Sequence, residues 1–312
     1  MTMTMRAVVL TLGWFAAINA GASLLAWLLT GLASSRPQGG APRRLVLIRL
    51  LPACASILFA GGMFLPSHLL FEPRDANDTL GLLWYSLSIA GAFLVVRSAW
   101  RACDVWRHGR QLRRVERGSD PALGGARQVD GFSGVSLAGV ISPRILIGPD
   151  VVRELTPAEL DVAIAHEVAH RDAFDNLVRW LMLCAPDFFG HSTRAQRLED
   201  DWHEAAESLA DARAVLGDRV RAVHLASALV KVARLAARAP RGREIPAWST
   251  LNDPPLLEHR VRCLLSGALP PLAPRGPRLP VALTLVAGLI GAVPAAAESI
   301  HRMTEQLVRL LP

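Results

Sequence analysis

Four stretches of this chain carry no aspartate, glutamate, lysine or arginine over lengths close to that of a membrane crossing. They are residues 7–35, 50–71, 79–96 and 279–297. A helix needs about 20 mostly apolar residues to cross the hydrocarbon core of a bilayer. We therefore predict an integral membrane protein that is mainly α-helical, with about four spans. Apolar residues make up 51% of the chain, and their concentration in these stretches distinguishes it from an ordinary soluble protein.

Arginine is unevenly distributed between these stretches. Residues 34–49 carry four arginines and no acidic residue, and residues 97–117 carry seven arginines against two acidic residues. Basic segments stay on the cytoplasmic side of a membrane. We therefore expect residues 97–278 in the cytoplasm and the N terminus and the tail 298–312 outside. The membrane would be the inner membrane of a bacterium. The net charge of +7 then points to membrane lipid as a partner and not to direct nucleic-acid binding.

This topology divides the chain into three parts. Residues 1–102 hold three transmembrane helices, residues 103–278 form a cytoplasmic domain, and residues 279–312 hold the fourth transmembrane helix and a short extracytoplasmic tail. In the cytoplasmic part, residues 118–131 are rich in glycine and are expected to be flexible. Residues 141–148 alternate as a strand does, and residues 134–139 could be its partner.

Helices are expected over most of the remaining cytoplasmic part. Thr156, Pro157 and Glu159 have the spacing of a capping box with proline at the first helical position, so a helix should begin there. Further helices are predicted at about 173–185, 195–216 and 218–238, and in the second half of 251–267.

The capped helix leads into the sequence His-Glu-Val-Ala-His at residues 166–170. Two histidines four residues apart lie on one face of a helix, so the imidazoles of His166 and His170 can reach one metal ion. Glu167 is then placed to act on water as a general base and not as a ligand. This pattern indicates a catalytic zinc site.

A catalytic zinc needs a third protein ligand and an open position for water. Glu207 and Asp211 lie four residues apart, share a helix face and have alanine and leucine neighbours. Glu204 and His203 are rival ligands, whereas the acidic run at residues 199–201 is typical of a solvated surface. Spacing alone leaves the choice open.

Four segments resemble the BlaR1/MecR1-like integral-membrane metallopeptidases, which include antibiotic-sensing transducers. HEVAHRDAFDNL (166–177) resembles their HExxHxxxxDN element, and residues 141–170 resemble the strand and capped helix before it. ESLAD (207–211) is similar to their ExxxD element, and LEHRVRCLL (257–265) to a later Leu-Glu-x-Arg run. The resemblance implies that residues 103–278 form a zincin-like α+β metallopeptidase domain, inserted between membrane helices.

The resemblance also implies roles for individual residues. His166, His170 and Glu207 would bind Zn2+, Glu167 would be the catalytic base, and Asp211 would orient a ligand histidine.

Three more residues have two possible roles each. Asp175 and Asn176 match the family's Asp-Asn pair but could equally form a simple junction between helices. Arg260 matches the later arginine, which could bind a substrate backbone or a helix C terminus. Its alternative is a surface arginine near the membrane.

The expected function is that of a zinc endopeptidase in signalling or regulated proteolysis. Its substrate would be a cytoplasmic or juxtamembrane protein, such as a transcriptional repressor or the chain itself at residues 118–131. An extended substrate would pair with strand 141–148. The transducers carry a sensor domain after the last span, where this chain has only residues 298–312, so a separate sensor protein is a further expected partner.

Two alternatives remain open. A non-catalytic signalling scaffold would close its metal site with a fourth ligand, for which His203 and Glu204 are available. A quality-control or processing protease of the HtpX or CAAX type shares HExxH and ExxxD, but these enzymes generally place fewer spans before the motif. A transporter is less consistent with the sequence, since the spans carry no charged residue in their middles.

Overall fold

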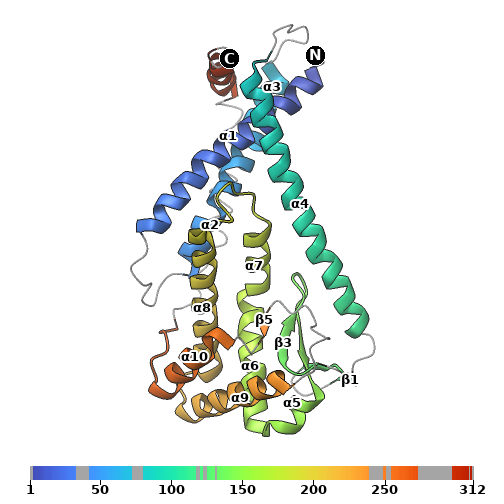
Figure 1. Cartoon of the computed structure of the whole chain (residues 1–312), viewed down its shortest axis with the longest axis vertical. Coiled ribbons are helices and arrows are strands. Elements are labelled where there is room, and N and C mark those ends of the chain that lie inside the picture. The colour runs from blue at the N-terminus through green and yellow to red at the C-terminus, as the bar shows by residue number, and fades with distance from the viewer. Residues whose placement is uncertain are drawn as a thin grey trace.

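The computed structural model is mostly helical and has a narrow upper part and a broad lower part (Figure 1). It describes residues 3–32, 42–71, 80–116, 120–121, 125–130, 132–238, 249–250, 254–272, 297–308 and 310. Long helices form the upper part, and shorter helices with a small sheet form the lower part. The first helix and the helical residues 297–308 meet at the upper end of the molecule.

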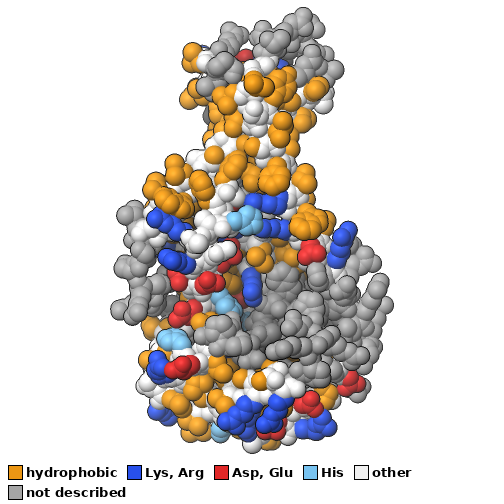
Figure 2. All heavy atoms as spheres, viewed as in Figure 1, with side chains coloured by type: hydrophobic (Ala, Val, Ile, Leu, Met, Phe, Trp, Pro, Cys, Tyr) orange, Lys and Arg blue, Asp and Glu red, His pale blue; other side chains and the backbone are white. Residues whose placement is uncertain are grey.

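Three helical stretches among the described residues are long and apolar enough to cross a membrane: Met3–Gly31, Pro42–Phe71 and Leu82–Val105. The first stretch belongs to α1 (Met3–Leu32) and the third to α4 (Leu82–Glu116). The second consists of α2 (Pro42–Ser56), a π-helical segment (Ile57–Phe64) and α3 (Leu65–Phe71). Figure 2 shows hydrophobic side chains around the narrow part and charged ones over the broad part. The first three predicted spans thus coincide with helices long and apolar enough to cross a membrane, whereas the fourth, at 279–297, lies outside the described residues except for Ala297.

Two helix boundaries differ from the prediction. The second span begins at Pro42, so Arg49 lies on a helix and not in a loop. The third span and the basic segment after it form one helix, α4. Arginine is tolerated near the end of a span because its long side chain can reach the interface or a buried acidic partner.

The sheet contains five short strands in the order β1-β2-β4-β3-β5. They are β1 (Asp120–Pro121), β2 (Arg127–Gln128), β3 (Val135–Ala138), β4 (Arg144–Ile147) and β5 (Ser249–Thr250). Strands β3 and β4 form the antiparallel pair that the sequence predicts, with Val135 opposite Ile147. Strands β1 and β2 fall within residues 118–131, so part of that segment is paired in the sheet and is not a free loop.

Strand β4 was expected to pair with an extended substrate, and the sheet order excludes this pairing at Leu146 and Ile147. On one side β4 pairs with β3, and on the other side Leu146 and Ile147 pair with β2. A strand offers free backbone groups only along an edge of a sheet. An interior strand with neighbours on both sides cannot accept a further strand there.

Six helices complete the lower part: α5 (Pro149–Glu154), α6 (Pro157–Ala173), α7 (Asp175–Cys184), α8 (Thr193–Val215), α9 (Arg219–Arg238) and α10 (Pro254–Ser266). Helix α6 begins with the predicted capping box, in which Thr156 and Glu159 each accept a backbone hydrogen bond from the other. Apolar side chains of β3, β4, α6 and α9, such as Leu137, Ile147 and Leu225, form the main core. This core holds α6 against the sheet.

Helices α7 and α8 also pack against the membrane spans (Figure 1). One buried cluster combines Ala26, Leu45 and Ile48 of the spans with α7 and α8 side chains. The α7 and α8 members are Met182, Leu198, Trp202 and Ala206. The cluster therefore contains residues from both sides of the expected domain boundary after residue 102.

Candidate metal site

Helix α6 carries the His-Glu-x-x-His sequence in the interior of the lower part. Its length and stable cap keep the helix regular through residues 166–170, and the helical period then places both histidines on one face. His166 and Glu167 have no exposed surface, and His170 is 2% exposed. The motif is thus buried among protein groups and does not lie on a solvated helix.

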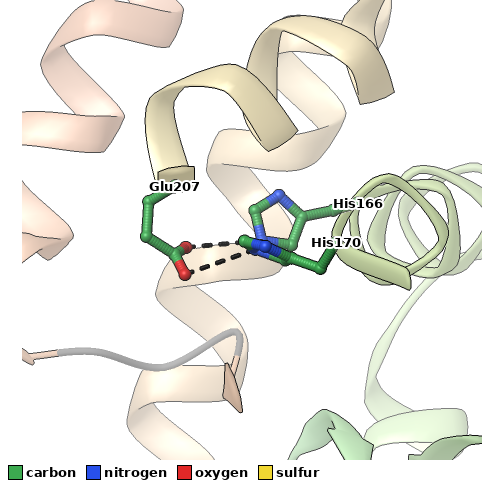
Figure 3. A group of neighbouring side chains, drawn as sticks. All are labelled: His166, His170 and Glu207. Carbon is green, nitrogen blue, oxygen red and sulfur yellow. Dashed lines mark hydrogen bonds and ion pairs between the residues drawn. The ribbon is translucent and has the colours of Figure 1, made fainter. Parts of the chain in front are cut away.

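Helix α8 brings Glu207 to these histidines, as Figure 3 shows. One nitrogen of each imidazole and a Glu207 carboxylate oxygen lie within 4.8 Å of one another. The His166 and His170 Nε2 atoms are 3.0 Å apart. Glu207 Oε2 lies 3.4 Å from His166 Nε2, and Oε1 lies 3.3 Å from His170 Nε2.

These separations suit a small tetrahedral metal ion. Bonds of about 2.0–2.1 Å in tetrahedral geometry hold neighbouring ligand atoms roughly 3.3 Å apart. Two neutral imidazoles and one carboxylate form a donor set typical of catalytic zinc. The arrangement therefore fits a divalent ion such as zinc, although the ligand set by itself does not identify the metal.

An acidic residue faces the other nitrogen of each histidine. Asp175 Oδ2 lies 2.7 Å from His170 Nδ1, and Asp211 Oδ1 lies 2.9 Å from His166 Nδ1. The hydrogen bond with Asp175 keeps the proton of His170 on Nδ1 and leaves Nε2 free to bind a metal. The contact of Asp211 with His166 is an ion pair without hydrogen-bond geometry. The resemblance implies that Asp211 orients a histidine, and Asp175 lies in a matching position beside His170.

Arg260 of α10 lies beside the same group and is 2% exposed. Its Nε and Nη2 donate to the two Asp211 oxygens over 2.9 and 2.6 Å, and Nη1 lies 2.8 Å from Glu207 Oε2. Burial alone would lower the pKa of Arg260, but Asp211 and Glu207 together raise it above its ordinary value. The reading of Arg260 as a surface arginine is wrong, because the side chain is buried between two carboxylates.

Glu167 differs from every other acidic residue of the site. It has no exposed surface, and neither carboxylate oxygen has a hydrogen-bond partner among the described residues. Burial raises the pKa of Glu167 above its ordinary value. A buried carboxylate without protein partners is costly, and the cost is explained if the group acts on a ligand at the site.

Asp175 and Asn176 lie at the junction between α6 and α7. Phe174 takes a left-handed backbone conformation, with φ of 58°, where α6 ends. Asn176 then donates hydrogen bonds to the carbonyl oxygens of Leu137 and Gly139 in and after β3. The pair therefore forms the helix junction and also joins His170 to the sheet.

The rival ligands lie outside the group of three. Glu204 is about half exposed and lies 3.5 Å from His259 Nε2. His203 lines a small pocket beside His170 and Glu207. Within the described part of the chain, Glu207 is the residue that joins the two histidines in a potential metal-binding group.

No protein-family model matches this chain, and no match was found among curated proteins.

Proposed function

We propose that this protein is a membrane-embedded zinc endopeptidase in which His166, His170 and Glu207 hold the metal. The observation that carries the proposal is Glu167, which is fully buried beside the three ligands and has no described hydrogen-bond partner. A purely structural metal site has no use for such a carboxylate, whereas hydrolysis requires a base next to the metal.

Zinc bound there would polarise the scissile carbonyl and make a water molecule more acidic. The residues of the chain supply the rest of the chemistry. Glu167 accepts a proton from the attacking water and delivers it to the leaving amine. Asp175 and Asp211 hold the two imidazoles so that their Nε2 atoms face Glu207, and Arg260 balances the charge of Glu207 and Asp211.

The proposed fold of the catalytic part is zincin-like. Its support is the arrangement of a motif helix, α6, packed against a sheet, with the third ligand on a second helix, α8. The resemblance to the BlaR1/MecR1-like peptidases supports the same assignment.

The substrate class follows from the expected topology. With the basic segments in the cytoplasm, the site reaches a cytoplasmic or juxtamembrane protein, for which the resemblance favours a transcriptional repressor. A separate sensor protein would supply the signal. A non-catalytic scaffold predicts the same metal group but no cleavage.

The metal content of the full chain, purified in detergent, tests this proposal. We expect one zinc per chain in the wild type, in Glu167→Gln and in Glu204→Ala, and none in Glu207→Ala. Glu204→Ala is the matched control because it removes an exposed carboxylate from the same helix.

Cleavage of a peptide library separates the enzyme from the scaffold. Activity is expected in the wild type and in Glu204→Ala but not in Glu167→Gln. Zinc without cleavage in the wild type would favour the scaffold with a structural metal. A wild type without zinc would rule out the enzyme and leave a metal-free scaffold.

A further inference from the structure

The turn between α7 and α8, residues 185–192, lies among the three candidate spans that the structure describes. Arg49 of α2 reaches it with Nη1 3.3 Å from Asp187 Oδ2, and its Nε donates to Glu199 Oε1 of α8 over 2.8 Å. Arg49 is 3% exposed and Asp187 is 5% exposed. A buried guanidinium that forks between two carboxylates fixes the orientation of both partners.

The other two spans hold the same turn. From α1, Asn19 donates to the carbonyl oxygen of Pro186 over 3.0 Å, and the Ser23 hydroxyl accepts from the backbone of Phe188. From α4, Arg97 donates to the carbonyl oxygen of Asp187 over 2.9 Å. The turn is thus bonded to the spans through backbone and side-chain groups.

Apolar packing extends this contact toward the metal site. The cluster that joins α1 and α2 to α8 includes Trp202 and Ala206. Ala206 directly precedes Glu207, and Trp202 lines the small pocket that contains His170 and Glu207. One continuous set of contacts therefore runs from the spans to the third ligand.

The stiffness of α8 couples the position of Glu199 to that of Glu207. Glu199 and Glu207 lie eight residues apart on α8, which is about 12 Å along a stiff rod. A change in the position of Glu199 therefore moves Glu207, because the helix does not bend freely between them. A third ligand that is misplaced by even 1 Å weakens a metal site.

We propose that Arg49 is a positioning residue for the metal site, through which membrane span α2 holds α8 so that Glu207 meets the two histidines. The spans are then a structural part of the site and not only its anchor. This inference rests on the proposed function for its metal, but the position of α8 can be measured without any metal.

The test uses the full chain in detergent with three substitutions of one helix. Arg49→Gln removes both ion pairs, and Arg49→Lys keeps the charge but not the fork. Arg44→Gln is the matched control, since Arg44 is exposed on the same helix α2. Hydrogen exchange of peptides covering residues 198–210 reports the ordering of α8, and peptides from α9 report whether the fold is kept. Zinc affinity is measured by competition with a chelator.

In Arg49→Gln, we expect exchange of α8 amides to become at least about 10-fold faster and zinc affinity to fall about 10-fold, as for other partners that orient metal ligands. Exchange in α9 should not change, Arg49→Lys should lie between, and Arg44→Gln should match the wild type.

Equal α8 exchange in Arg49→Gln and Arg44→Gln would overturn the proposal, and so would faster exchange with unchanged zinc affinity. If the wild type binds no zinc, the proposed function fails. The role of Arg49 in positioning Glu207 as a metal ligand then fails with it. A wild type that binds zinc while Arg49→Gln behaves as Arg44→Gln removes only the positioning role.

Discussion

Two clusters of charged residues lie about 12 Å apart along α8, at Glu199 and at Glu207, and they differ in how their charges are matched. Around Arg49, the guanidinium meets Asp187 and Glu199, and the remaining polar groups of the turn bond to α1 and α4. Around His166, the acids are matched by Arg260 and the histidines, except for Glu167. Ion-paired charges are typical of a structural contact, whereas a buried carboxylate with no hydrogen bond to either oxygen, as in Glu167, points to chemistry.

The largest expected effect comes from changing Glu167. Glu167→Gln should lower kcat about 10²–10⁴-fold, the usual contribution of a general base. It should not lower the temperature of unfolding, because no described hydrogen bond is lost. Kinetics and thermal unfolding of the same preparation check both halves. Unchanged kcat would remove Glu167 from the mechanism.

Arg260 should contribute mainly to stability, as expected of the Arg49 cluster and in contrast to Glu167. Arg260→Gln leaves Asp211 and Glu207 buried with one neutral partner, and breaking a buried ion pair costs about 3–5 kcal/mol. We expect a clear fall in unfolding temperature, measured with zinc removed by a chelator. The control is Arg262→Gln on the same helix, because the Arg262–Glu258 pair is exposed.

The two acids behind the histidines give a smaller effect. Asp175→Asn should weaken zinc binding about 10–100-fold, as expected for a group that orients a ligand histidine. Its effect should appear in the dissociation constant for zinc and not in kcat at saturating zinc. A variant with unchanged zinc affinity would show that Asp175 serves only the junction between α6 and α7.

The smallest effect concerns the capping box of α6. Burial alone would raise the pKa of Glu159, but hydrogen bonds from Lys231, Ser227 and Thr156 lower it from 4.5 to about 2. The ionised form is therefore favoured by folding. Its stabilisation is fully present above pH 4.5 and is lost as the pH falls toward 2.

Glu159→Gln should cost about 1 kcal/mol near neutral pH, as for the loss of a helix cap. Its difference from the wild type in unfolding temperature should shrink as the pH is lowered from 6 to 3. Glu258→Gln, which removes an exposed carboxylate, should show almost no difference at either pH. A constant difference for Glu159→Gln would contradict the pKa assignment.

Local patterns in the sequence determined most of the helices and half of the site. Three of the four charge-free runs coincide with helices long and apolar enough to cross a membrane, and the capping box predicted the start of α6. The four-residue spacing of His166 and His170 predicted that they share a face. Each of these depends on neighbours within a few residues, where helix period and backbone geometry decide the result.

Tertiary structure alone decided which distant groups meet these histidines. Spacing left Glu204, His203 and Glu207 as rival ligands, and packing of α8 against α6 brings Glu207 to them. Arg260 and Arg49 resembled ordinary basic residues because their acidic partners lie 49 and 138 residues away. Only the packing of whole helices places such charges together, since no local period relates residues so far apart in the chain.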